Sequence, residues 1–96
     1  MGPPAARLQD ICTGHGCWPP RPNCQASTDV FTNSRGNHRV TDAWEVHCCL
    51  IECHASVTAA GSSTVFVNSL SAARVGDAVA CGSTIMTGSN NVFIGG

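Results

Sequence analysis

The chain has 96 residues, enough for one domain and too few for two, so we expect residues 1–96 to form a single domain. Charged residues make up only 11% of the chain, lysine is absent, and the formal net charge is −1. This balance excludes the basic field that a nucleic-acid partner requires. Only nineteen residues are Leu, Ile, Val or Phe. A core with so few large side chains predicts an additional source of stability, which can be disulfides, a metal or a partner protein.

Taken in chain order, the predicted elements are short strands separated by turns. Three strand candidates share a Val-Phe pair flanked by Ser, Asn or Gly: residues 30–32, 65–67 and 92–94. Turn-forming residues follow the first two, so each is expected to fold back as a hairpin. Residues 42–50 are the best helix candidate, but the segment is short and contains β-branched residues and cysteines. We therefore predict an all-β fold in which helix is minor at most.

The chain contains three copies of one pattern, in which an Arg-x-x-Asp unit is followed by a Ser-x-x-Val-Phe phrase. The Arg-x-x-Asp units are Arg7–Asp10, Arg39–Asp42 and Arg74–Asp77. We interpret each pair as an arginine–carboxylate interaction that fixes a turn. Three similar units favour a pseudo-threefold arrangement around an axis, because closure buries one face of every unit at a common centre.

Each copy has one residue of a metal-binding type at nearly the same distance after its Asp. His15 and His47 lie five residues after the Asp of their units, and Cys81 lies four residues after Asp77. If the units are related by an axis, these three side chains converge on it. Two imidazoles and a thiolate suit Zn²⁺, although iron could use the same ligands.

A fourth ligand must come from outside the repeat, because structural zinc is four-coordinate. His54 is the best candidate, since it follows His47 by seven residues in the longest Cys-rich segment. Cys49 and Cys53 are its competitors. A closed set of four ligands leaves no open position for water, so a structural metal is favoured over a catalytic one. His38 lies outside the register, and we expect it on the surface.

The other cysteines have no ligand pattern. We expect Cys12, Cys17, Cys24, Cys48 and Cys53 to be buried thiols or adventitious. A Cys12–Cys17 or Cys17–Cys24 disulfide is the alternative in an oxidising compartment. Because the chain has neither the regions of a secretory leader nor a myristoylation signal, we expect synthesis in the cytoplasm.

Several of these phrases resemble the PAAR-repeat family. Residues 2–7 contain Pro-Ala-Ala-Arg, residues 72–77 read Ala-Ala-Arg-Val-Gly-Asp, and residues 88–95 close the chain in a similar way. The middle copy departs from the motif, because Asn37-His38-Arg39 replaces Ala-Ala-Arg and Thr41 replaces Gly. The length resembles that of stand-alone members.

The resemblance implies a small cone of short β-hairpins around a metal, with hairpin turns at its base that include residues 34–37 and 69–71. Three His and one Cys would hold the metal near the apex. The cone, monomeric by itself, would cap a trimeric β-helical spike, one copy per trimer, in a phage tail baseplate or a type VI secretion device. It would help to pierce the target membrane through transient contact, without enzymatic activity, in the virion or in the secreted spike.

Two other classes of function compete with a spike tip. A free-standing zinc-binding regulator is one, and the lack of basic patches and Cys-x-x-Cys pairs argues against it. The other is a small zinc-dependent hydrolase acting on envelope polymer. A hydrolase needs an open coordination position and an acidic general base, for which Glu45 and Glu52 are the only glutamates.

Overall fold

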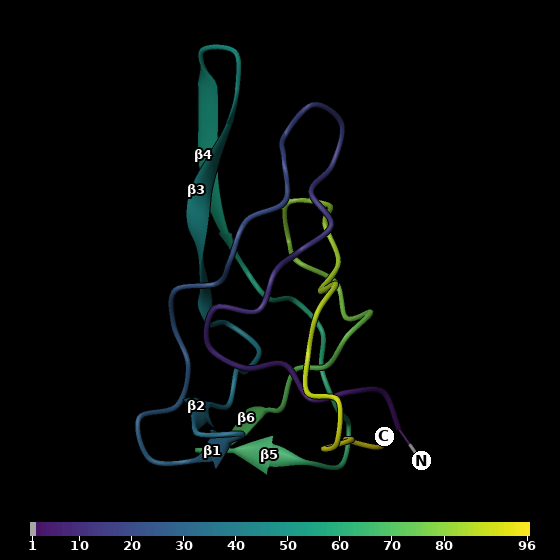
Figure 1. The fold of residues 1–96 in the computed structure, drawn as a ribbon. Helices are drawn as coiled ribbons and strands as arrows, with labels where there is room; N and C mark the ends of the chain where they lie inside the picture. The colour runs from purple at the N-terminus through teal and green to yellow at the C-terminus, as the bar shows by residue number, and fades with distance from the viewer. Residues whose placement is uncertain (1) are drawn as a thin grey trace.

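The computed structural model describes residues 2–96 and contains six strands (Figure 1). They are β1 (Phe31–Thr32), β2 (Arg35–Gly36), β3 (Ala43–Cys49), β4 (Glu52–Val57), β5 (Phe66–Val67) and β6 (Leu70–Ser71). Consecutive strands pair antiparallel in three hairpins, and residues 2–96 contain no helix, hence none that could cross a membrane. The all-β prediction is confirmed. The helix candidate at 42–50 is wrong, because most of its residues form β3.

The protein is elongated, measuring 38 × 24 × 21 Å. The β3–β4 hairpin extends to one end, and the four two-residue strands gather at the other end together with the first and last described segments of the chain (Figure 1). We call the end with β1, β2, β5 and β6 the base, and the end with the β3–β4 turn the tip. The core between them is small: Trp44, Ile85 and Val79 are its largest apolar side chains.

The two short hairpins at the base turn earlier than expected. Their two-residue turns are Asn33–Ser34, with φ of 54° and 65°, and Asn68–Ser69, with φ of 54° and 67°. Positive φ at both turn positions gives the twist that tight hairpins require, and Asn tolerates it. The predicted turns are therefore right for Ser34 and Ser69 but extend too far, since residues 35–36 and 70–71 are the returning strands.

All three phenylalanines pair in the same way. Each lies antiparallel to the residue three positions before an arginine of the repeat: Phe31 with Gly36, Phe66 with Ser71, and Phe93 with Pro4. The third pairing joins the two ends of the chain.

A closed cycle of backbone hydrogen bonds links the three units. The Ala6 amide donates to the Ala73 carbonyl, Ala73 donates to His38, and His38 donates to Ala6, each at 3.0 Å. Because each unit donates to one neighbour and accepts from the other, the cycle supports the pseudo-threefold arrangement. The symmetry itself stays a prediction.

The arginine–aspartate pairs are confirmed as turn-fixing interactions. In each unit the carboxylate accepts hydrogen bonds from the backbone amide, Nε and Nη2 of the arginine, which are 2.8–2.9 Å long for Arg39 and Asp42. Arg7–Asp10 and Arg74–Asp77 repeat this pattern. The enclosed turn needs positive φ, and Thr41 adopts it at 77° although Gly76 occupies the equivalent position.

His38 is buried, contrary to its predicted surface position. It occupies the place that Ala6 and Ala73 take in the hydrogen-bonded cycle, so its side chain enters the interior. Its Nδ1 donates to the Gln25 carbonyl at 2.8 Å, and its Nε2 lies 2.7 Å from Thr58 Oγ1. Burial lowers the pKa of His38; the Gln25 bond and the Asp42 and Asp10 charges oppose this, and the Arg39 charge adds to it.

This depressed pKa predicts that acid destabilises the metal-free protein. The unfolded state binds the His38 proton below about pH 6.5, whereas the folded state resists protonation. The free energy of unfolding therefore falls as pH drops below about 6.5. Urea titrations at pH 7.5 and 5.5 measure this slope. His38→Ala, which installs the residue of the other two units, should make this slope shallower, and an equal slope in both proteins would contradict the prediction.

Candidate metal centre

His47 and His54 lie directly opposite each other on β3 and β4. A register shift between Trp44 and His47 interrupts the strand alternation, so both residues are buried although they are three positions apart. The seven-residue spacing of the two histidines thus becomes a cross-strand pair on one face of the hairpin.

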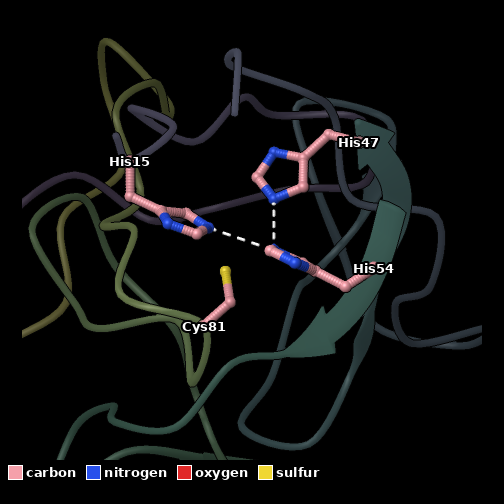
Figure 2. A group of neighbouring side chains, drawn as sticks. All are labelled: His15, His47, His54 and Cys81. Atoms are coloured by element: carbon pink, nitrogen blue, oxygen red, sulfur yellow. Dashed lines mark hydrogen bonds between the residues drawn. The ribbon is translucent and has the colours of Figure 1, made fainter. Parts of the chain in front are cut away.

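Two loops bring the remaining side chains to the same place. His15 lies between Gly14 and Gly16, whose φ values of 74° and 53° let the loop turn sharply. Cys81 precedes Gly82, which has a φ of 110°. Figure 2 shows the Cys81 sulfur facing the three imidazoles. Their potential ligand atoms all lie within 4.8 Å of one another. The four predicted site residues are thus together, and metal binding by them is a proposal.

The imidazoles meet through their Nε2 atoms. His54 Nε2 lies 2.7 Å from His47 Nε2 and 3.1 Å from His15 Nε2 (Figure 2). His47 Nδ1 lies 2.8 Å from the Pro19 carbonyl, which can only accept, so Nδ1 carries the proton and Nε2 presents a lone pair. A cation placed between the three Nε2 atoms would accept this lone pair, and also those of His15 and His54 when their protons are on Nδ1.

The protonation state of His47 also suits a metal ligand. Burial lowers its pKa most; the hydrogen bond to Pro19 opposes this, and the charges of Arg21, His54 and His15 lower the pKa further. A lowered pKa keeps the imidazole neutral at neutral pH, which is the form that binds metals. Three imidazoles and one thiolate fit a tetrahedral Zn²⁺ site. When bound, such an ion would tie two loops to the β3–β4 hairpin.

Trp18 covers the cluster of His15, His47, His54 and Cys81, although it lies outside the register of the repeat. Its ring stacks on His15 at a centroid distance of 5.0 Å and lies 5.0 Å from His54. Its Nε1 donates to the Glu52 carbonyl at 3.2 Å, which attaches the ring to β4. Its place three residues after His15 is its only sequence signal, which is too weak to predict a cover for the cluster.

Removing this cover should speed metal release. Trp18→Ala loses two aromatic contacts worth about 0.5–1.5 kcal/mol each, so zinc should transfer to a chromophoric chelator about tenfold faster. Stopped-flow absorbance measures the transfer. Trp18→Phe is the matched control, because it keeps a stacking ring and loses only the bond to Glu52. Equal release rates for the wild type and the alanine variant would contradict this role.

The cysteine pairing differs from both predicted alternatives. Cys17 is bonded to Cys49, and Cys48 is bonded to Cys53. The competing ligands Cys49 and Cys53 are therefore occupied, and the predicted partnership of Cys17 with Cys12 or Cys24 is wrong. The Cys48–Cys53 bond lies beside the cluster, because β3 and β4 place Cys48 opposite Cys53 next to the His47–His54 pair.

The other thiols are free, and they differ in surroundings. Cys12 is buried, as one of the two predicted alternatives has it, whereas Cys24 is exposed, so burial does not explain this second thiol. Burial raises the pKa of the Cys12 thiol, but hydrogen bonds from Ser83, Arg21 and Gly14 outweigh it and leave the pKa lowered. Cys81 is half-buried in the cluster.

Comparison with known proteins identifies the family. The model of the PAAR motif family matches residues 13–87, which is most of the chain and includes all four clustered residues. The chain belongs to the PAAR motif family. Comparison with individual proteins finds a similar segment in two bacterial toxins from Pseudomonas aeruginosa. They are the NAD(P)(+) glycohydrolase toxin Tse6 and the (p)ppApp synthetase toxin Tas1. Each is 36% identical over 78 residues, covering 75% of this chain. The match spans only 18% of each toxin.

Proposed function

We propose that this PAAR protein is the metal-stabilised tip of a trimeric β-helical spike in a contractile injection device. The family match over residues 13–87 carries the proposal. The relatives are bacterial toxins, which favours a type VI secretion device over a phage baseplate. Because they share only a minor part of their length with this chain, neither toxin's activity is transferred to it.

The base supports docking on a trimeric partner. Each repeat exposes an apolar Val-Phe pair there, and the phenylalanines Phe31, Phe66 and Phe93 are 60%, 58% and 42% exposed. A threefold spike presents the same surface three times around its axis. One chain with three equivalent pairs can therefore cover three equivalent strand ends, which would otherwise remain unpaired.

The opposite end supports membrane entry. Leu50 and Ile51 form the β3–β4 turn and are 95% and 100% exposed, so the foremost side chains of the tip are apolar. Apolar side chains enter a bilayer without the desolvation cost that polar ones carry. The Cys48–Cys53 bond and the metal cluster brace the hairpin behind this turn. Contact with the target membrane would be transient, since two side chains are too few for an anchor.

The metal in this proposal is zinc, with iron as the alternative that the same ligands accept. A closed set of three His and one Cys suits a structural role, and we propose no catalytic activity for this chain. The protein would be made in the cytoplasm as a monomer. It would leave the cell with the spike.

Co-purification with a spike protein tests the proposal. The tagged chain is mixed with a trimeric β-helical spike protein encoded in the same genome, and native mass spectrometry determines the stoichiometry. We expect one chain per spike trimer. No binding, or three copies per trimer, would overturn the capping arrangement. An unrelated β-helical trimer serves as the control for non-specific apolar binding.

A further inference from the structure

Arg21 is a buried cation without an acidic partner. Its side chain belongs to a residue that is only 4% exposed. The other four arginines each pair with an aspartate, whereas within residues 2–96 no carboxylate lies within 4.0 Å of Arg21. A buried charge needs compensation from nearby groups. The groups around this guanidinium should therefore indicate what it is for.

Two sulfur atoms take the place of the missing carboxylate. Arg21 Nη1 lies 3.0 Å from Cys12 Sγ, and Nη2 lies 3.6 Å from Cys81 Sγ. The Nε of Arg21 donates to the Glu45 carbonyl, and the guanidinium carbon lies 5.5 Å from the centre of the Trp44 ring. Backbone and ring thus fix the guanidinium, and its outer two nitrogens are directed to the sulfurs. One of these sulfurs belongs to the metal cluster.

We propose that Arg21 is a positioning residue of the metal centre, whose planar fork holds the Cys81 sulfur toward the three imidazoles and uses Cys12 as its second anchor. The assignment rests on the metal site proposed above. A thiolate is a far better hydrogen-bond acceptor than a thiol, so the contact strengthens when Cys81 is a ligand. Partners that orient ligands in this way tune a site as much as the ligands do.

The fork geometry makes arginine specific for this role. A guanidinium presents donors in a rigid plane and can bridge two acceptors at once, whereas an ammonium is a point charge on a flexible stem. Lysine at position 21 would keep the charge but could not hold both sulfurs in the same arrangement. Methionine would keep the apolar stem against Trp44 and lose all donors.

Cobalt(II) substitution tests the assignment, because its thiolate-to-metal charge-transfer band reports on the Cys81 sulfur directly. A hydrogen bond to the sulfur lowers the energy of its lone pairs, and so raises the energy of this band. Arg21→Met should shift the band of the cobalt-loaded protein to lower energy. Arg21→Lys should not restore the wild-type band. Arg35→Met, which removes a partly exposed arginine with no contact to the cluster, is the matched control and should leave the band unchanged.

A second variant keeps the assignment testable if Arg21→Met fails to fold. Cys12→Ala leaves the guanidinium in place and removes its other anchor, so a smaller shift to lower energy is expected. Superimposable bands for the wild type, Arg21→Met and Cys12→Ala would overturn the assignment of Arg21 and leave the metal site standing. A wild-type band in Arg21→Lys would have the same consequence. A wild-type protein that takes up no cobalt would overturn the metal site itself, and the assignment with it. Spike binding is measured separately, so that failure of the docking proposal and failure of the Arg21 assignment are distinguishable.

Discussion

Cys81→Ala is expected to abolish tight zinc binding and to lower the melting temperature of the zinc-loaded protein by about 15–30 °C. A metal held a thousandfold above its dissociation constant stabilises the folded state by about 4 kcal/mol. Each kcal/mol corresponds to about 4–8 °C in a domain of this size. The reason is geometric: Cys81 supplies the one sulfur among the four clustered residues, and a bound ion would tie its loop to the three imidazoles.

Calorimetry of the zinc-loaded and chelator-treated proteins measures this effect. The chelator should lower the melting temperature of the wild type and leave that of Cys81→Ala unchanged. His54→Ala should behave in the same way, because His54 contacts both other imidazoles. Cys24→Ala is the matched control, since it removes an exposed free thiol that lies outside the cluster. Stoichiometric zinc in Cys81→Ala with an unchanged melting temperature would refute the predicted ligand set.

The repeat carries most of what the sequence can predict. Because the three units are in register, counting from each Asp is enough to place His15, His47 and Cys81 together. The same register aligns His38 with Ala6 and Ala73, and this alignment indicates that His38 is buried. That signal is masked, since a histidine in a polar segment ordinarily favours solvent.

Residues outside the repeat give no comparable signal. Arg21 and Trp18 lie in the loop between the first Asp and the first Val-Phe phrase, where no second copy exists for comparison. The disulfide partners are equally inaccessible, because seven cysteines allow many pairings and the choice depends on where the loop of Cys17 meets β3. Tertiary placement of a single loop therefore decides the features that the sequence does not predict.

The last prediction concerns the base. Phe66→Asp should weaken binding to the spike trimer at least about thirtyfold, because a central aromatic residue in an interface is commonly worth about 2 kcal/mol or more. An aspartate also brings a charge into a surface that loses its water on docking. Phe31→Asp should have a similar effect if the three pairs are equivalent, and the double variant should bind no spike at micromolar concentration. Surface plasmon resonance on immobilised spike measures the loss.

Leu50→Asp provides the matched control for this prediction. It introduces the same charge at an apolar side chain that is 95% exposed, but at the tip instead of the base. Spike affinity should therefore stay at the wild-type value. The opposite result, in which Leu50→Asp loses binding and the phenylalanine variants keep it, would mean that the chain docks through the β3–β4 turn. In that orientation the three Val-Phe pairs would face the target, and the apolar repeat would require another explanation.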